Sequence, residues 1–452
     1  MKRTSFLQLF LLILALPLVG LGCKNSGAIE QESLPPITLN YWRVFDEPGD
    51  FTDISAKFKQ RHPNVTVVVK KLRFEEYEDE VVRALASGEG PDIVSVQASW
   101  LRQYQNLLTG MPESVTLPTA FIDGKNIQIK LSTERMPSAR DVKNRFVDVV
   151  SDDVVIDGTI YGLPLSIDTL VLFYNRTLFN QANIPTPPRT WNDFKEEVKL
   201  LTIQDRNGEI VQSGAAFGGS GNINRAPDIL SLLMIQNGTT MTNDKNTEVM
   251  FNQAAGRTRD APVPGQDALR FYTDFASPAK EVYTWNESMP ESLNAFASNR
   301  TAMFLGYSYH LPLIRSLAPG MDLGVSPAPQ ISETGAQVNF ANYWVEGVTK
   351  QSGHQDEAWA FVNFMTEQER VTSFLENARK PTALRALIAN QREDAELAPF
   401  ANQLLTATSW YRGKNAGAME SALRAMIRRV TSGELTAEQA VEEAVKQINA
   451  SY

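Results

Sequence analysis

Cysteine and histidine are nearly absent from this chain of 452 residues, which has one cysteine and three histidines. With Cys23 as its only thiol, the protein can form no internal disulfide, so its stability must come from its core. The histidines His62, His310 and His354 lie far apart and fit no metal-ligand spacing, and neither H-E-x-x-H nor G-x-S-x-G occurs. The sequence therefore predicts no metal site, no cofactor and no catalytic residues.

An excess of basic charge is also missing. The chain has 43 Lys and Arg residues against 52 Asp and Glu residues, for a net charge of −9. Binding to a phosphate backbone needs a basic surface, so we expect no nucleic-acid partner. About 450 residues with 43% hydrophobic composition suffice for two lobes, each with its own core.

Long hydrophobic runs are confined to the start of the chain. Lys2 and Arg3 precede an apolar stretch at residues 6–19, and the small residues Gly20 and Gly22 lead into Cys23. This pattern predicts a lipoprotein signal at 1–22, cleavage before Cys23, and acylation of that thiol by a diacylglycerol and a fatty acid such as palmitate. Cleavage would remove two basic residues and no acid, and so would change the net charge from −9 to −11.

The alternatives are an uncleaved anchor or an ordinary export signal, since lipoprotein signals usually carry Leu where this chain has Gly20. Residues 23–36 are polar and contain Ser, Gly and Pro, which indicates a flexible tether. We therefore expect an extracytoplasmic protein anchored to the bacterial cell membrane by a lipid on Cys23.

Alternating strand and helix patterns follow the tether. Residues 37–44, 65–69 and 93–96 are strand-like, while apolar spacings of three and four over 51–58 and 74–85 indicate helices. Such alternation predicts an α/β fold with a largely parallel sheet, in which ligands bind beyond the carboxyl ends of the strands. Residues 109–150 carry three prolines and are expected to form an irregular insertion.

Four segments, in this order and spacing, resemble the extracellular solute-binding proteins of ABC importers, family 1, in their sugar-binding branch. The first segment is 37–104, whose last strand carries GPDIV at 90–94 and is followed by a loop. The second is DGTIYGLP at 157–164, with LFYNR at 172–176 and TWNDF at 190–194. The third and fourth are FASNRTAM at 296–303 and AWAFVNF at 358–364. Together they span nearly the whole chain after the tether.

The resemblance implies a periplasmic-binding-protein-like fold of two α/β lobes around a central cleft. By position, the hinge crossings are expected near 166–169, 304–306 and 343–347. Lobe 1 would then comprise 37–167 plus 305–344, and lobe 2 would comprise 168–304 plus 345–452. Ligand would bind in the cleft, and the lobes would close by hinge motion.

The resemblance also implies a function without covalent chemistry. The expected protein is a tethered monomeric receptor that captures a carbohydrate and delivers it to ABC permease subunits. The alternatives are a binding protein for another solute, such as a polyamine, peptide or phosphodiester, and an exported glycoside hydrolase. A hydrolase needs two carboxylates about 5–10 Å apart, for which Asp46, Glu47 and Asp168 are the candidates.

Sugar sites combine flat aromatic faces with planar polar groups that hydrogen-bond hydroxyls. Strand-end loops supply some candidates, and positions that the resemblance places at the cleft supply the others. The predicted ligand-binding residues are Trp42, Glu47, Gln97, Trp100, Asp168, Tyr307, Trp344, Trp410 and Tyr411. For each of them the alternative is an ordinary place in the core, in a hinge or on a solvated turn.

Overall fold

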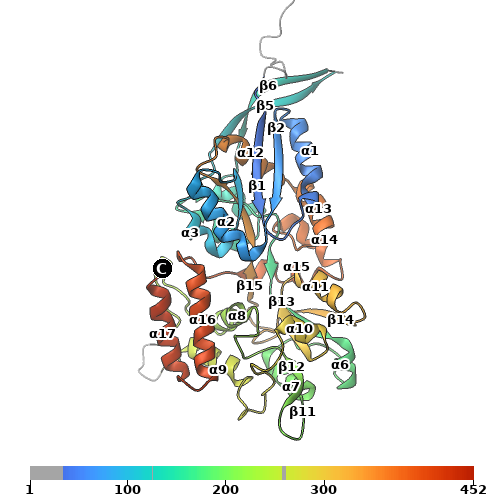
Figure 1. Ribbon diagram of the computed structural model, residues 1–452, viewed down its shortest axis with the longest axis vertical. Coiled ribbons are helices and arrows are strands. Elements are labelled where there is room, and N and C mark those ends of the chain that lie inside the picture. The colour runs from blue at the N-terminus through green and yellow to red at the C-terminus, as the bar shows by residue number, and fades with distance from the viewer. Residues whose placement is uncertain (1–33, 125, 257–260) are drawn as a thin grey trace, which may run out of the picture.

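The computed structural model describes residues 34–124, 126–256 and 261–452. The molecule is elongated, with two lobes stacked along its long axis (Figure 1). Each lobe is built on one five-stranded sheet with helices around it. The predicted Cys23 lies outside the described residues, as does most of the predicted tether.

The sheet of the first lobe has the order β2-β1-β3-β16-β4. These strands are β1 (Ile37–Arg43), β2 (Val65–Lys71), β3 (Ile93–Gln97), β4 (Leu108–Thr109) and β16 (Trp344–Thr349). β1 runs parallel to β2 and β3, as the alternating pattern predicted. The predicted helices are also present, as α1 (Thr52–Arg61) and α2 (Phe74–Ser87). Both contribute buried apolar residues to the core of the first lobe. β3 is buried along its whole length, whereas β1 alternates between buried and more exposed positions.

The insertion at 109–150 was expected to be irregular, and this expectation is wrong. Residues 114–135 form a hairpin of β5 (Ser114–Asp123) and β6 (Asn126–Arg135), which pair over ten positions. Val115 and Leu117 alternate with exposed residues on β5 and are buried. Pro118 hid this period-two pattern, but a strand of a two-stranded ribbon has a free edge where a missing N–H is tolerated.

The rest of the first lobe surrounds this frame. It comprises α3 (Leu101–Tyr104), α4 (Ala139–Arg145), α5 (Asp148–Val154), β7 (Val155–Ile156), β8 (Thr159–Ile160), α12 (Gln355–Met365), α13 (Gln368–Ala378) and α14 (Ile388–Arg392). Aromatic rings join the helices to the sheet, with Phe58 of α1 and Phe361 of α12 at 5.0 Å between centroids. This packing buries the inner faces of α1 and α12 together.

The sheet of the second lobe has the order β11-β12-β13-β10-β14. Its strands are β10 (Val171–Asn175), β11 (Ile203–Gln204), β12 (Ile210–Ala215), β13 (Thr301–Gly306) and β14 (Leu323–Pro327). Its helices are α6 (Arg176–Gln181), α7 (Trp191–Leu201), α8 (Ala226–Gln236), α9 (Pro264–Asp274), α10 (Ser292–Ala297), α11 (His310–Leu317) and α15 (Ala398–Ala401). The first turn of α7 has a capping box formed by Thr190 and Asp193, a Thr-x-x-Asp pattern that can be read directly from the sequence.

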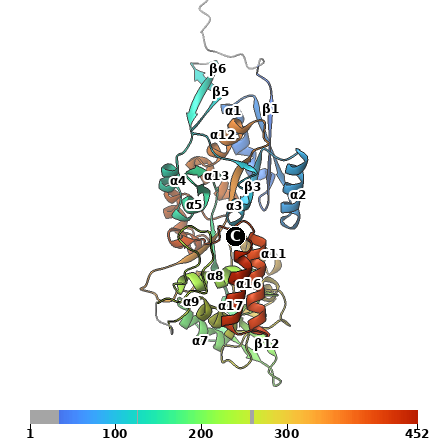
Figure 2. The ribbon, with the colours of Figure 1, turned by 90° about the vertical axis from the view of Figure 1, so that its left-hand side faces the viewer.

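Two long helices, α16 (Ala416–Thr431) and α17 (Ala437–Asn449), end the chain. They lie against α8 and α9 and belong to the core of the second lobe (Figures 1 and 2). A capping box of Thr436 and Gln439, the Thr-x-x-Gln pattern of the sequence, begins α17. Within the described ranges no helix is long and apolar enough to cross a bilayer.

A small third sheet of β9 (Asp168–Thr169), β15 (Asn339–Asn342) and β17 (Ala407–Thr408) lies where the chain passes between the lobes. The first core contains 37–167 and 341–388, and the second contains 170–340 and 410–448, with a few exchanges near residue 400. This division differs from the predicted boundaries. Strand β14 and helix α11 pack in the second lobe, and β16 and α12 pack in the first.

Candidate functional site

A cavity of about 260 Å³ lies between the lobes. The ends of β1, β3 and β16 line it from the first lobe, the segment leading into β9 lines it from the hinge, and the loop after β13 and the segment before α8 line it from the second lobe. The side chains used below are Arg43, Phe45, Asp46, Phe74, Gln97, Asp168, Arg225, Tyr307, Ser308, Tyr309, Trp344, Glu346 and Lys380. The cavity therefore lies beyond the carboxyl ends of the parallel strands β1 and β3, where the fold class predicts a ligand.

The first lobe presents an aromatic wall to the cavity, formed by Phe45, Phe74 and Trp344. Phe45 and Phe74 are stacked at 5.8 Å between centroids, and Trp344 meets Phe45 edge-on at 5.9 Å. Trp100 supports Trp344 from behind at 5.4 Å. More than two-fifths of each Phe side chain is exposed, 42% for Phe45 and 43% for Phe74. Exposed rings at a cavity offer flat apolar surface to a ligand.

One ring contact crosses the cavity. Phe45 of the first lobe stacks on Tyr309 of the second, with centroids 5.8 Å apart and planes 10° from parallel. Because these residues belong to different lobes, their contact helps to set the distance between the lobes.

An ion-pair network lies beneath the aromatic wall. The guanidinium of Arg43 contacts the carboxylates of Asp46 and Glu346, and the ammonium of Lys380 contacts Asp46. Burial alone would raise the pKa of Asp46, but Arg43 and Lys380 hold that pKa below its usual value. Asp46 is therefore ionised and already paired.

The second lobe and the hinge supply a polar side, formed by Asp168, Arg225, Tyr307 and Ser308. The backbone N–H and the hydroxyl of Ser308 donate to the Asp168 carboxylate at 2.8 and 2.5 Å. Burial raises the pKa of Asp168 to about 7, although these hydrogen bonds oppose the shift. Asp168 therefore changes charge near neutral pH.

Asp228 of α8 organises the rest of the polar side. Its carboxylate accepts from Arg225 at 2.6 Å, from the Tyr307 hydroxyl at 2.5 Å and from the Asn342 amide at 3.2 Å. Asn342 in turn accepts from the side chain of Gln97 on β3 at 2.7 Å. A chain of hydrogen bonds thus runs from the first lobe, through β15, to the second.

The structure brings four predicted residues together: Gln97, Asp168, Tyr307 and Trp344 all line the main cavity. Gln97 and Trp344 are direct partners in the pairing of β3 with β16. Trp100 was predicted to contact ligand, and it stands behind Trp344 in the aromatic cluster.

The other predicted residues lie elsewhere. Trp410 and Tyr411 line a separate cavity of about 40 Å³, and each is only 4% exposed. Trp42 lies under the ammonium of Lys70, 4.2 Å from its ring centroid. Glu47 is exposed and pairs with Lys71. Neither Trp42 nor Glu47 lines the main cavity, and their role in binding stays a prediction.

Several cavity residues were not predicted. Phe45 lies in the same loop as the candidates Asp46 and Glu47, so its position was a usable signal. Tyr309 lies two residues after Tyr307. By contrast, Lys380 and Arg225 reach the cavity from segments with no local motif. Among the described residues no group of three or more His, Cys, Asp or Glu side chains is arranged to hold a metal ion.

Comparison with known proteins gives consistent matches. A family model described as bacterial extracellular solute-binding protein matches residues 46–370. The galactooligosaccharide-binding protein of Bacillus subtilis is 21% identical over 393 residues, which cover 86% of this chain and 82% of that protein. The multiple sugar-binding protein of Streptococcus mutans is 23% identical over 56% of this chain and 57% of its own length.

Solved structures show the same architecture. A cyclo/maltodextrin-binding protein complexed with maltotetraose superposes with a TM-score of 0.70 at 17% identity, over 92% of this chain and 97% of that one. An ABC substrate-binding protein from Listeria monocytogenes in complex with cycloalternan gives 0.69 at 17% identity, over 92% and 98%. The predicted two-lobed α/β fold is therefore confirmed.

Proposed function

Since the chain belongs to the family of bacterial extracellular solute-binding proteins, which are binding proteins and not enzymes, we propose that it captures a carbohydrate between its lobes and delivers it to an ABC permease. The observation that carries this proposal is the cavity itself, where an aromatic wall faces a polar side. The relatives named for galactooligosaccharide and multiple sugars support the same ligand class.

A sugar matches both sides of this cavity. The apolar C–H face of a pyranose can lie on Phe45, Phe74 or Trp344, while its hydroxyls can hydrogen-bond to Asp168, Arg225 and the other polar groups. Arg225 and Asp168 offer a donor and an acceptor, which hydroxyl groups can satisfy together.

A polyamine fits this cavity less well. The carboxylates of Asp46 and Asp228 already contact Arg43, Lys380 and Arg225. A cationic ligand that bound to either of these two carboxylates would have to displace their partners and leave buried cations unpaired, which costs several kcal/mol. The polar side therefore favours a neutral ligand rich in hydroxyls.

The test is a thermal-shift screen of the protein in detergent against maltotetraose, galactooligosaccharides and arabinooligosaccharides, with spermidine and a tripeptide as controls. A ligand that binds only the native state at 100 times its Kd adds about 2.7 kcal/mol to the free energy of unfolding. Recovered sugar should keep its chain length. A response to spermidine alone, or shortened sugar chains, would contradict the proposal.

We also propose that Cys23 is acylated and that residues 23–36 tether a monomer to the outer face of the cell membrane. The support is the signal pattern at 1–22 and the extracellular location of the family. The variant Cys23→Ser should move from the detergent phase to the aqueous phase in a Triton X-114 partition while keeping its melting temperature. Retention in the detergent phase would point to another anchor.

A further inference from the structure

We propose that the β5–β6 hairpin inserts its tip into the lipid surface to which the chain is tethered. The hairpin tip comprises the side chains of Phe121, Ile122 and Ile127. The inference rests on the proposed lipid anchor, which would bring this end of the molecule to the membrane. The proposed partner of the tip is a phospholipid bilayer.

The tip exposes large apolar side chains in one place. The exposed fractions are 44% for Phe121, 85% for Ile122, 72% for Ile127 and 63% for Leu131. Ile122 and Ile127 are direct cross-strand partners on one face at the outer end of the ribbon, Phe121 lies beside them on the other face, and Leu131 lies nearer the base, opposite Pro118. Single exposed apolar residues are ordinary, but a contiguous group of them marks an interaction site.

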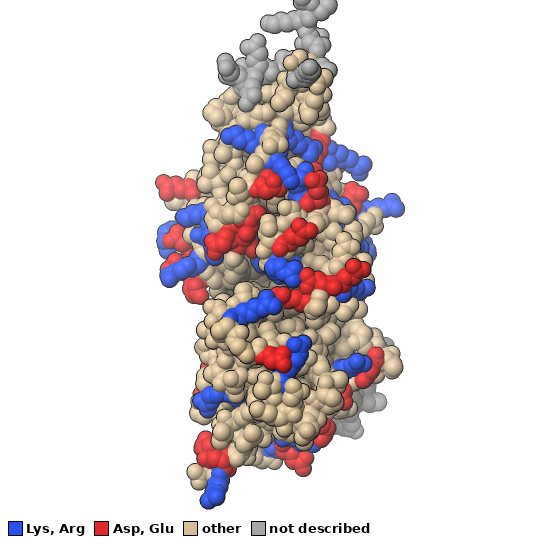
Figure 3. All heavy atoms as spheres, turned by 90° about the vertical axis from the view of Figure 1, so that its right-hand side faces the viewer, with Lys and Arg blue, Asp and Glu red and all other residues tan. Residues whose placement is uncertain are grey.

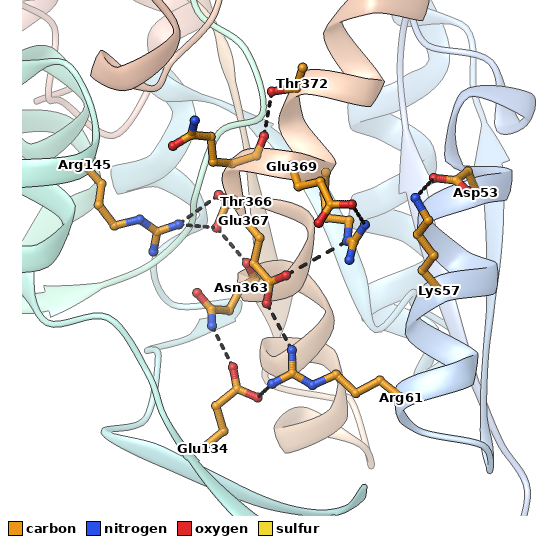
Figure 4. Close-up of polar contacts among 12 residues, drawn as sticks. Asp53, Lys57, Arg61, Glu134, Arg145, Asn363, Thr366, Glu367, Glu369 and Thr372 are labelled. Carbon is orange, nitrogen blue, oxygen red and sulfur yellow. Dashed lines mark hydrogen bonds and ion pairs between the residues drawn. The ribbon is translucent and has the colours of Figure 1, made fainter. Parts of the chain in front are cut away.

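The base of the hairpin is fastened to the lobe (Figure 4). Arg61 of α1 bridges Glu134 of β6 at 2.8 Å and Glu367 at 3.0 Å, and the amide of Asn363 donates to Glu134 at 3.1 Å. The His62 imidazole contacts the Pro118 carbonyl at 2.9 Å. Exposed ion pairs are individually weak, but contacts from two helices and both strands fix the direction of the ribbon.

Beyond Pro118 the ribbon extends outward. The residues from 118 to 123 span about 17 Å at the usual rise of a strand. Figure 1 shows the hairpin at one end of the molecule, with the second lobe at the other. The tip is therefore the outermost described part of the first lobe, away from the cavity.

The tether enters at this same end. The side chain of Asn64 donates to the Pro35 carbonyl, and the Ile37 amide donates to the Asn64 carbonyl at 2.8 Å, beside His62 at the hairpin base. Cys23 precedes the first described residue, Leu34, by eleven positions, which reach at most about 40 Å when extended. A lipid on Cys23 would hold this end of the molecule close to the bilayer.

The net charge of the protein indicates whether apolar insertion or electrostatic attraction would hold the tip at the membrane. The net charge of −9 opposes an anionic surface. Figure 3 shows a group of Lys and Arg side chains below the hairpin end of the molecule, the sequence of the turn contains Asp123, and Lys130 is exposed beside Leu131. The binding free energy of an interfacial segment scales with its buried apolar area. Apolar insertion is thus expected in neutral lipid, without a need for anionic headgroups.

The experiment uses the lone cysteine. When Cys23 is acylated, Ile122→Cys introduces the only free thiol, which is labelled with an environment-sensitive fluorophore in the full chain. The matched control is Val211→Cys, a β-branched residue that is 55% exposed and lies on β12 in the sheet of the second lobe. Each labelled protein is reconstituted into phosphatidylcholine vesicles with and without a doxyl-labelled lipid.

We expect blue-shifted emission and several-fold stronger doxyl quenching at position 122 than at position 211. Adding Ile127→Asp, directly opposite, should return the emission of the label to that of water without changing the melting temperature. Equal quenching at both positions would overturn the proposal. A blue shift without doxyl quenching would also overturn it, because it would indicate a second copy or another protein on the tip.

A wild-type chain in which Cys23 is not acylated can be recognised separately, because its free thiol would itself react with the fluorophore. Both labels are therefore repeated in the Cys23→Ser background with added vesicles. If the wild-type chain takes up label, the comparison is decided in the Cys23→Ser background alone. Stronger quenching at 122 than at 211 there supports the hairpin, and equal quenching overturns the insertion, whatever anchors the chain.

Discussion

The two lobes face the cavity with different chemistry. The first lobe contributes the aromatic wall, whereas the second lobe and the hinge contribute the polar side, with Tyr309 as its one ring in contact with that wall. Apolar contact is non-directional and tolerates loose geometry, but hydrogen bonds need defined distances and angles. We therefore expect ligand to adhere first to the first lobe and to be selected by the second lobe as the cleft closes.

The same contrast appears in the use of tryptophan. Trp344 of the first lobe borders the main cavity and is partly buried, whereas Trp410 of the second lobe is 4% exposed and donates to Ser231 at 3.0 Å. A tryptophan thus offers surface to a ligand in one lobe and fills the core in the other. Substitutions at these two positions test the comparison directly.

The largest expected effect is that of Trp410→Ala on stability. Removal of this buried ring should leave a cavity and lower the free energy of unfolding by about 3–5 kcal/mol. Denaturant unfolding measures the loss, and calorimetric titration of the folded fraction should show nearly unchanged affinity. A stable variant with strongly weakened binding would show that the second lobe also offers an aromatic platform.

The next effect is a pH dependence confined to the polar side. The pKa of Asp168 is about 7 in the folded protein against 3.8 for an ordinary Asp. Between pH 4 and 7 the unfolded chain has already lost this proton and the folded protein retains it, so the stabilising contribution declines as pH rises. Three pKa units correspond to about 4 kcal/mol, and water in the cavity should reduce this to about 2 kcal/mol.

The measurement is the unfolding free energy of the wild-type protein minus that of Asp168→Asn across this pH range. The difference should fall towards pH 7 and stay flat below pH 4. A flat difference throughout would mean that Asp168 ionises normally and that its hydrogen bonds from Ser308 outweigh burial.

A smaller effect is expected for Trp344→Ala, on binding rather than on stability. Loss of one aromatic platform is worth about 1–2 kcal/mol, or roughly tenfold in Kd. Titration with a sugar found in the thermal-shift screen measures it, with Trp344→Phe as the variant that keeps a ring. A stability loss as large as that of Trp410→Ala would place Trp344 in the core and remove the contrast between the lobes.

The smallest effect concerns the stack of Phe45 on Tyr309. Such a ring pair contributes about 0.5–1.5 kcal/mol, so Phe45→Ala should shift ligand-free protein towards more open conformations. Small-angle scattering should then give a larger radius of gyration, and Phe45→Tyr should not. An unchanged radius would assign control of the lobes to the chain of hydrogen bonds from Gln97 to Asp228.

Local patterns in the sequence sufficed for the β-α-β-α-β start of the first lobe and for the capped helices α7 and α17. A local pattern also placed Gln97 after a strand of the first lobe, and the family resemblance placed Trp344 at a crossing between the lobes; both line the cavity. These features depend on residues close in sequence, or on a family pattern of several short motifs.

Features set by distant pairing were not predictable in this way. Strand β14 joins the second lobe because it pairs with β10, where Leu172 lies opposite Ser326, and nothing near residue 326 indicates that partner. Trp410 resembled a site residue because it lies outside any helical stripe, but its ring packs beside Phe251 and Tyr411 in the second core. Burial of this kind depends on the whole fold.

The position of β16 has a consequence for the order of folding as the chain is made. β3 is flanked by β1 and β16, yet every strand of the second sheet precedes β16 in the chain. Until residue 349 has emerged, β3 keeps an unpaired edge, which is prone to misassembly. The sheet that begins first is thus completed last. Hydrogen exchange on nascent chains halted just before residue 344 should find protected amides in β12 and β13, and weaker protection in β3.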